Sequence, residues 1–176
     1  MSGSGAPART STIVVMGVAG CGKSTVMAAL ADRLGWPTAE ADDFHSPASI
    51  DKMRSGRPLT DADRRPWLEA IAEWIRRHEL ADESAIVTCS ALRRGYRDVL
   101  ARDHPSVWFA HLVVAPAVLA DRLERRRGHY MPASLLASQL ETLEPLDPDE
   151  PGAAIDADRP PPEIVGDIVA KLGLTG

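Results

Sequence analysis

The stretch Gly17-Val18-Ala19-Gly20-Cys21-Gly22-Lys23-Ser24 decides the fold of this chain. It follows a short β-branched run from Thr12 to Met16, which predicts a buried strand. It leads into residues 23–34, where apolar side chains recur at helical spacing before Gly35. A strand, a glycine-rich loop and a helix in this order are the context in which such a loop binds phosphate. The sequence therefore predicts a phosphate-binding loop here.

Each residue type in this loop has a chemical reason to be present. Gly17 and Gly22 permit backbone angles and close approaches that a side chain would block, so successive N–H groups can face phosphate oxygens. Lys23 adds a positive charge, and Ser24 opens a helix whose N-terminal dipole favours anions. We expect ATP as the ligand, Lys23 as a catalytic residue and the Ser24 hydroxyl as a ligand to Mg²⁺. The expected nucleotide-binding residues are Gly17, Val18, Ala19, Gly20, Cys21, Gly22, Lys23, Ser24 and Thr25.

Beyond the loop, strand patterns alternate with helix patterns. This alternation predicts an α/β fold with a central parallel five-stranded sheet, helices on both faces and ligands at the carboxyl ends of the strands. Pro66 is expected in the first turn of its helix. The expected strands lie at 12–16, 38–41, 85–89, 107–114 and 153–155, and the expected helices at 23–34, 66–80, 96–102, 118–127 and 163–172.

Size and composition narrow the class of protein. The chain has 176 residues, 44% hydrophobic and 26% charged, which fits one globular domain and contains no apolar run long enough to span a membrane. Its net charge of −5 argues against a nucleic-acid-binding or membrane-binding surface. Residues 93–129 nevertheless hold eight arginines against four acidic residues. Arginine concentrated in one stretch of an acidic protein favours a site for a small anion.

Two features bear on the cellular compartment. Residues 1–11 are small and polar and lack the apolar centre of a secretory signal, so we expect a flexible tail. The two cysteines are Cys21 and Cys89, and a disulfide at Cys21 would distort the phosphate loop. We therefore expect a reducing cytoplasm. Cys21 is either a small residue that fits the loop or a thiol whose pKa the helix N-terminus lowers.

Arg122 and Arg126 lie four residues apart and so share one face of a predicted helix. This pair resembles the start of the lid in kinases similar to nucleoside-monophosphate kinases. The resemblance implies that Arg122 stacks on adenine and that Arg126, a catalytic residue, reaches the transferred phosphate. The alternative is a solvated basic helix face.

The segments between these motifs resemble the gluconokinase family of small phosphate-loop kinases over nearly the whole chain after the tail. The resemblance implies a P-loop kinase domain at 12–176, with a helical substrate-binding insert at about 42–82 and a lid at about 122–145. It is carried by residues 16–25, 40–45, 50–53, 58–68, 89–98, 128–131 and 138–144. Ala41 departs from the family, in which glycine is usual at this point.

The resemblance implies D-gluconate as the substrate, which offers a primary hydroxyl at one end and a carboxylate at the other. Asp42, just after the second strand, is expected to orient the hydroxyl and accept its proton. Its alternative role is a helix N-cap. Arg64, Arg93 and Arg97 are the candidates to bind the carboxylate, because a guanidinium pairs with it bidentately. Arg97 follows Arg93 by one helical turn, so both could face one pocket.

Three further residues have two interpretations each. His45 is either a hydrogen-bond donor to substrate hydroxyls or a packed histidine. Gln139 either contacts substrate or braces the lid that residues 128–131 begin. Pro160 belongs to a segment that resembles an adenine-holding loop, and it is otherwise the start of the last helix.

Taken together, the expected reaction is transfer of the γ-phosphate of Mg-ATP to the 6-hydroxyl of D-gluconate. Shikimate kinase, or another small-metabolite P-loop kinase, is the enzymatic alternative. Shikimate kinase would have a Gly-Gly-Gly turn where this chain has Cys89-Ser90-Ala91. A non-catalytic ATP-binding regulator is the alternative from another class. Analogy with relatives suggests a homodimer.

Overall fold

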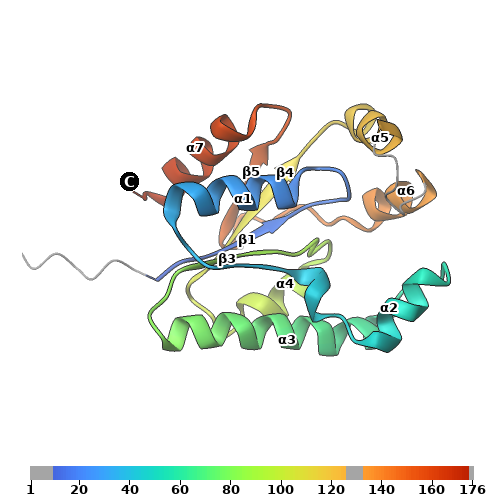
Figure 1. Cartoon of the computed structure of the whole chain (residues 1–176), viewed down its shortest axis with the longest axis horizontal. Helices are drawn as coiled ribbons and strands as arrows, with labels where there is room; N and C mark the ends of the chain where they lie inside the picture. Colours follow the sequence, from blue (N-terminus) through green and yellow to red (C-terminus); the bar gives the residue numbers. More distant parts are fainter. Residues whose placement is uncertain (1–9, 126–132, 175–176) are drawn as a thin grey trace, which may run out of the picture.

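A parallel sheet of five strands forms the centre of the molecule. The computed structural model describes residues 10–125 and 133–174. The strand order is β2-β3-β1-β4-β5, and every neighbouring pair is parallel (Figure 1). This confirms the predicted sheet. The strands are β1 (Thr12–Met16), β2 (Thr38–Glu40), β3 (Ala85–Thr88), β4 (Val107–Val113) and β5 (Gly152–Asp156).

Alternate side chains of β1 point to opposite faces of the sheet, and helices cover each face. Ile13 and Val15 pack into one hydrophobic core with α1 and α7, whereas Val14 and Met16 pack into another with α3 and α4. All four side chains are fully buried, as a strand covered on both faces requires. Figure 1 shows the resulting three layers. The covering helices are α1 (Lys23–Leu34), α7 (Pro161–Leu172), α3 (Asp61–Leu80) and α4 (Arg94–Ala101).

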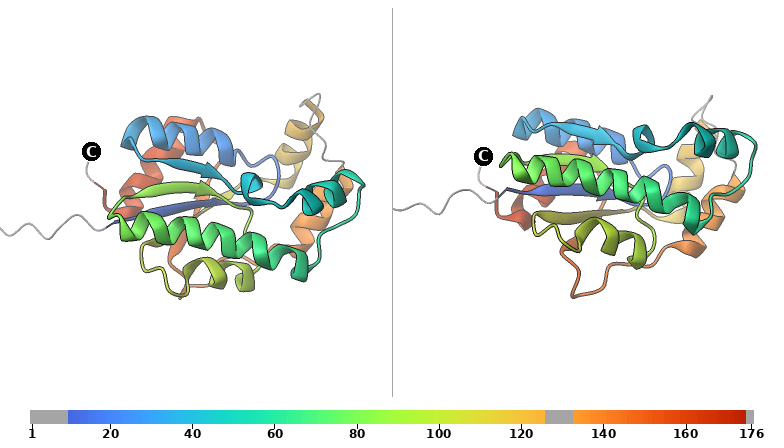
Figure 2. Two further views of the ribbon diagram at one scale, coloured as in Figure 1. Left: turned by 60° about the horizontal axis from the view of Figure 1, so that its bottom comes forward. Right: turned by 90° about the horizontal axis from the view of Figure 1, so that it is seen from below.

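The remaining short elements lie beyond the carboxyl ends of the strands, at the right of Figure 1. Figure 1 shows α2 on the side of α3, with α5 and α6 on the other side, and both views of Figure 2 place these three helices at the same end of the molecule. Segments far apart in sequence thus surround the edge of the sheet where ligands bind in folds of this kind. These elements are the 3-10 helix η1 (Ala41–Phe44) and the helices α2 (Pro47–Arg54), α5 (Pro116–Arg125) and α6 (Ala133–Thr142).

Helix α3 begins five residues earlier than the sequence pattern predicted, so Pro66 lies inside the helix and not in its first turn. A capping box explains the earlier start. The Thr60 hydroxyl accepts a hydrogen bond from the Asp63 N–H, and the Asp63 carboxylate accepts one from the Thr60 N–H. These bonds satisfy N–H groups at the helix N-terminus, and the helix continues through Pro66, which has no N–H to donate. The first turn of α3, which carries Arg64, is thereby ordered.

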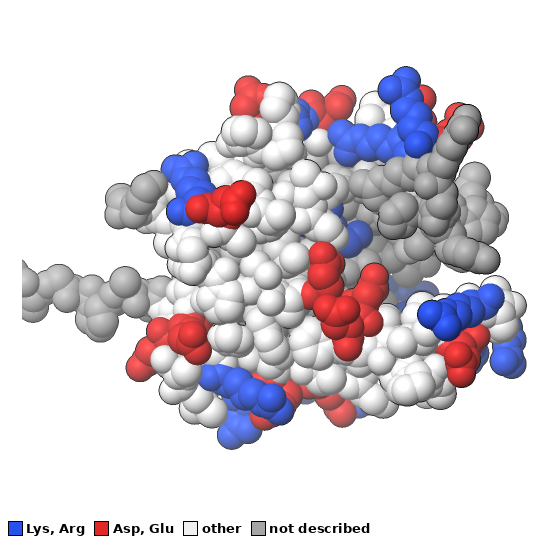
Figure 3. Space-filling model, in the orientation of Figure 1, with Lys and Arg blue, Asp and Glu red and all other residues white. Residues whose placement is uncertain are grey.

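The surface in Figure 3 carries basic and acidic side chains interspersed over this face of the molecule. Many pair along one helix, as Arg65 does with Glu69 and Lys171 with Asp167. Within the described ranges, no helix is both long and apolar enough to cross a membrane.

Candidate active site

The phosphate loop connects β1 to α1 through residues with positive φ angles, which favour glycine. Gly17 has φ +145° and Gly22 has φ +99°. A Cβ atom on Gly17 would lie 2.7 Å from the Cys21 Sγ and 2.9 Å from the Leu112 carbonyl oxygen, so no side chain fits there. No side chain caps the start of α1 at Gly22, and Ser24 is exposed. The N-terminus of α1 is thus arranged to receive an anion.

The side chains of Lys23 and Gln139 form hydrogen bonds with the loop backbone. The Lys23 Nζ donates hydrogen bonds to the Gly17 carbonyl at 2.9 Å and to the Val18 carbonyl at 3.3 Å. The Ala19 N–H donates to the Gln139 Oε1 at 2.7 Å. An oxygen therefore already lies against a loop N–H group, in a position that suits a phosphate oxygen. The contact of Gln139 with the loop joins helix α6 to the nucleotide half of the site.

The two cysteines are free thiols and both are buried. Burial raises the pKa of the Cys21 thiol, and this effect outweighs the nearby charge of Lys23. Burial likewise raises the pKa of Cys89 to about 12. The interpretation of Cys21 as a thiol with a lowered pKa is therefore wrong. Cys21 is instead a small residue that fits between Gly17 and the core.

The residues expected to hold adenine come together at the outer side of the loop. The Arg122 guanidinium donates to the Gly20 carbonyl at 3.3 Å and to the Ala157 carbonyl at 3.5 Å, and it lies 4.0 Å from the Asp158 carboxylate. Pro160 is the N-cap residue of α7, two residues further on. Arg122 thus joins the phosphate loop to the segment that leads into α7. Arg126 and residues 128–131 of the expected lid lie outside the described residues.

Asp42 and His45 lie side by side after β2. The Asp42 side chain is 94% exposed and caps no helix, because the N-cap residue of η1 is Glu40. The His45 ring stacks on Trp67, with centroids 4.4 Å apart, and its Nε2 lies 3.9 Å from the Asp42 Oδ1. The structure thus supports the packed interpretation of His45 and argues against Asp42 as an N-cap.

Two of the three candidate arginines form one cluster. Arg64 and Arg93 lie over the Tyr96 ring, at 5.5 and 5.9 Å from its centroid. Each also lies 3.7 Å from the Asp61 carboxylate. The Tyr96 hydroxyl accepts from Arg64 at 3.2 Å and donates to Asp61 at 2.7 Å. Two cations that share one carboxylate form a suitable site for the carboxylate of a ligand.

Tyr96 and Asp61 were not expected in the site. Helical spacing was the signal that could have identified them, because Tyr96 follows Arg93 by three residues and Asp61 precedes Arg64 by three. The sequence pattern began this helix at residue 66, so Asp61 and Arg64 were not expected to be helical and their spacing of three residues predicted no contact. Burial and the hydrogen bond to Asp61 raise the pKa of Tyr96. The hydroxyl links Arg64 to Asp61, and the Tyr96 ring lies under both arginines.

Arg97 does not join this cluster, which corrects the expectation that it faces the same pocket as Arg93. Its side chain is 1% exposed, and its guanidinium pairs with Glu150, with Nε 2.7 Å from Oε1. It also donates to the Ala91 carbonyl at 2.9 Å. The physical reason is that Arg93 is the N-cap of α4 and not a helical residue, so the one-turn spacing does not align the two side chains.

The fold and the site define a class of protein, the P-loop kinases. A glycine-rich loop at a helix N-terminus, an exposed aspartate after β2 and an arginine cluster meet at the carboxyl end of a parallel sheet. The AAA domain family matches residues 13–146 of the chain.

The particular family follows from individual relatives. A gluconokinase from Gluconobacter oxydans is 48% identical over 157 residues, which are 89% of this chain and 88% of that protein. The crystal structure of a gluconokinase from Sinorhizobium meliloti is 46% identical, covers 94% of this chain and 93% of its own, and has a TM-score of 0.82. A sugar kinase from a Janibacter species is 49% identical, with a TM-score of 0.88 and coverage of 94% and 96%. The chain belongs to the gluconokinase family.

Proposed function

We propose that this protein transfers the γ-phosphoryl group of ATP to the 6-hydroxyl of D-gluconate and releases ADP and 6-phosphogluconate. One observation carries the proposal. The paired guanidiniums of Arg64 and Arg93 share the Asp61 carboxylate at 3.7 Å, in a chain that also has a complete phosphate loop. The names of the relatives supply the identity of the acceptor.

On the nucleotide side, the loop N–H groups and Lys23 bind the phosphates. Two of the three ammonium donors of Lys23 bind the Gly17 and Val18 carbonyls, which leaves one donor for a phosphate oxygen. The exposed Ser24 hydroxyl is the proposed protein ligand to Mg²⁺, which would neutralise charge on the transferred phosphate. Among the described residues no three His, Cys, Asp or Glu side chains come together to hold a metal ion. Arg122 is proposed to stack on adenine and Arg126 to bind the transferred phosphate.

On the acceptor side, we assign Asp42 to the 6-hydroxyl and the arginine cluster to the carboxylate. Phosphoryl transfer through a loose transition state depends mainly on positioning, so Asp42 orients the hydroxyl and receives its proton late. His45 is held by Trp67, and its Nε2 edge faces Asp42. That edge is available to a sugar hydroxyl that binds beside Asp42. Gln139 is proposed to turn from the Ala19 N–H toward substrate once phosphate occupies the loop.

The experiment that tests the function is ADP release measured in parallel with gluconate, shikimate and AMP as acceptors. Turnover with gluconate alone is the expected result. Faster turnover with shikimate or AMP would show that the proposed substrate is wrong and that the protein is another small-metabolite kinase. ATP binding without turnover on any acceptor would favour a non-catalytic regulator. Omission of Mg²⁺ is expected to abolish turnover.

Location and assembly are part of the same proposal. ATP and buried reduced thiols at Cys21 and Cys89 suit the cytoplasm. The partner is a small molecule and not a nucleic acid, in keeping with the net charge of −5. The homodimer suggested by relatives is tested by light scattering on the purified protein.

A further inference from the structure

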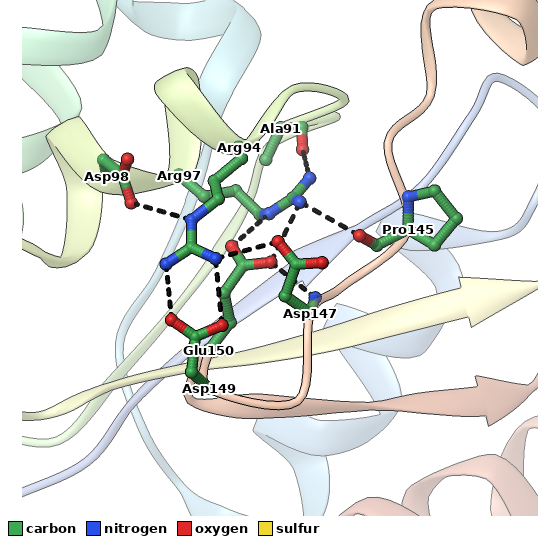
Figure 4. Close-up of polar contacts among 8 residues, drawn as sticks. All are labelled: Ala91, Arg94, Arg97, Asp98, Pro145, Asp147, Asp149 and Glu150. Atoms are coloured by element: carbon green, nitrogen blue, oxygen red, sulfur yellow. Dashed lines mark hydrogen bonds and ion pairs between the residues drawn. The ribbon is translucent and has the colours of Figure 1, made fainter.

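Arg97 is a buried cation close to the proposed substrate site that the reaction itself does not use. It lies on α4 and is among the largest fully buried side chains of the protein. Its guanidinium donates to both Glu150 oxygens, at 2.7 and 3.1 Å, and to the carbonyls of Ala91 and Pro145, at 2.9 and 3.4 Å (Figure 4). A buried charge needs such partners, because desolvation otherwise disfavours it strongly.

These bonds connect two segments that are distant in sequence. Ala91 belongs to the loop between β3 and α4, whereas Pro145 and Glu150 belong to the loop between α6 and β5. The Glu150 carboxylate also accepts a hydrogen bond from the Asp147 N–H at 2.8 Å, which fixes its own loop. In addition, the Glu144 N–H donates to the Leu92 carbonyl at 2.7 Å. Two successive residues of the loop that leads to Arg93 are therefore held, Ala91 by Arg97 of α4 and Leu92 by the Glu144 N–H after α6.

The backbone of this loop needs such support. Ala91 has φ +47°, a left-handed conformation that a residue other than glycine adopts only at an energetic disadvantage. The carbonyl group of Ala91 itself accepts the hydrogen bond from Arg97. Arg93 lies two residues further on, and its guanidinium is 46% exposed beside Asp61. The direction of the Arg93 side chain thus depends on a backbone conformation that Arg97 stabilises.

We propose that Arg97 and Glu150 are positioning residues for acceptor recognition, which fix the Ala91 backbone so that Arg93 faces the carboxylate of the acceptor. This inference rests on the proposed function, in which Arg93 binds that carboxylate. It assigns Arg97 an indirect role, because its guanidinium lies 1% exposed and contacts protein groups. Burial would raise the pKa of the Glu150 carboxyl, but the hydrogen bonds from Arg97 and from the Asp147 N–H outweigh this effect, so its pKa lies below its usual value.

The neighbouring residue Arg94 provides a matched control. Arg94, at the start of α4, links this helix to the same loop between α6 and β5, with hydrogen bonds to Asp149 at 2.7 and 2.9 Å and to Asp147 at 2.8 Å (Figure 4). These contacts are exposed to solvent, and none of them reaches Ala91. Replacing Arg94 thus removes a link between α4 and this loop without removing the support of the strained backbone.

The test compares Arg97→Lys, Glu150→Gln and Arg94→Gln by steady-state kinetics. A lysine at position 97 can pair with Glu150, but it lacks the planar fork that also reaches Ala91. Both changes in the buried pair are expected to raise the KM for gluconate about tenfold, with the KM for ATP changed less than about twofold. Arg94→Gln is expected to leave both constants unchanged. The assays are run at a temperature at which unfolding curves show that all variants are folded. Loss of folded protein would lower the apparent kcat but would not change the KM for gluconate alone.

A second readout is independent of activity. Hydrogen exchange of the Glu144 amide, which is bonded to Leu92, is expected to accelerate in Arg97→Lys and Glu150→Gln but not in Arg94→Gln, in the ligand-free protein. Equal effects of all three variants, or an unchanged KM for gluconate in the buried-pair variants, would overturn the positioning role. If the wild-type protein does not phosphorylate gluconate, the proposed function fails instead. The exchange rates then decide whether Arg97 fixes the loop.

Discussion

Gly17 lies where β1 turns into the phosphate loop, with φ +145° and with backbone and sulfur atoms close on both sides. We predict that Gly17→Ala abolishes measurable ATP binding and lowers the free energy of unfolding by about 1–3 kcal/mol. The added Cβ would lie 2.9 Å from the Leu112 carbonyl oxygen. This carbonyl belongs to the backbone of β4, so the strand would have to shift to make room. Calorimetric titration with ATP and urea unfolding measure the two effects.

Gly166 is the matched control for Gly17. It lies within α7, and a Cβ at this position would contact nothing within 4 Å. Because alanine favours a helix over glycine, Gly166→Ala is expected to stabilise the protein by about 0.5–1 kcal/mol with ATP binding intact. Normal ATP binding by Gly17→Ala would show that the close approach at Gly17 is not needed for the loop.

His45 makes the stability of the protein depend on pH. Burial lowers the pKa of His45 below its ordinary value of 6.5, although Asp42 opposes this shift. Below pH 6.5 the unfolded chain therefore binds a proton that the folded protein resists, and the free energy of unfolding falls as the pH decreases. Burial also lowers the pKa of His111, which adds to the same loss.

We predict that His45→Gln reduces, but does not remove, the decline in stability between about pH 6.5 and 5. Urea unfolding at several pH values measures the slope, so a constant loss of packing on Trp67 does not affect the comparison. His111 supplies the slope that remains. An identical slope in wild type and variant would mean that His45 titrates in the folded protein as it does in the unfolded chain.

At the scale of one element, the N-terminus of α3 combines stability with recognition. The capping box of Thr60 and Asp63 orders the turn that holds Asp61 and Arg64. Lys52 of α2 also binds the Asp63 carboxylate at 2.6 Å, and this bond together with those at Thr60 lowers the pKa of Asp63 to about 2. Two helices and part of the proposed carboxylate site therefore depend on one turn.

We predict that Thr60→Ala lowers the free energy of unfolding by about 1 kcal/mol and raises the KM for gluconate severalfold. The cause is fraying of the turn that carries Arg64. Ser46→Ala is the control, because Ser46 caps α2 in the same way, accepting from the Ser49 N–H at 3.1 Å, but α2 carries none of the proposed carboxylate ligands. It should lose similar stability with little change in KM. If both substitutions raise the KM for gluconate equally, the rise is not caused by fraying of the turn that carries Arg64.

At the scale of the whole molecule, the sheet and the phosphate loop were predictable because their signals are local. The apolar run of β1 and the glycines at 17 and 22 specify strand, loop and helix within one short stretch. The arginine cluster was only partly predictable, because the direction of each guanidinium depends on tertiary contacts. Arg97 follows Arg93 by one helical turn, which predicted that both face one pocket. The Arg97 guanidinium instead binds Glu150, 53 residues away along the chain.

The proposed active site has two half-sites, the phosphate loop for ATP and the arginine cluster for the gluconate carboxylate, and they come from different layers of the fold. The phosphate loop joins β1 to α1, whose helix covers one face of the sheet, whereas Arg93 precedes α4 on the opposite face. A ligand that binds one half-site should therefore stabilise the folded protein without the other half-site. At 100 times its dissociation constant, a ligand contributes about 2.7 kcal/mol, or an increase of about 5–10 °C in the melting temperature of a domain of this size.

We predict that thermal unfolding of two variants separates the half-sites. Lys23→Ala should lose the increase in melting temperature caused by ATP and retain the increase caused by gluconate. Arg93→Ala should show the reverse, because Lys23 is the proposed phosphate ligand and Arg93, beside Asp61, is a proposed ligand of the gluconate carboxylate. Neither variant should turn over substrate at the wild-type rate, since phosphoryl transfer needs donor and acceptor held together. If Arg93→Ala keeps the full response to gluconate, the carboxylate is bound elsewhere, and the arginine cluster is a structural feature of the α3–α4 layer.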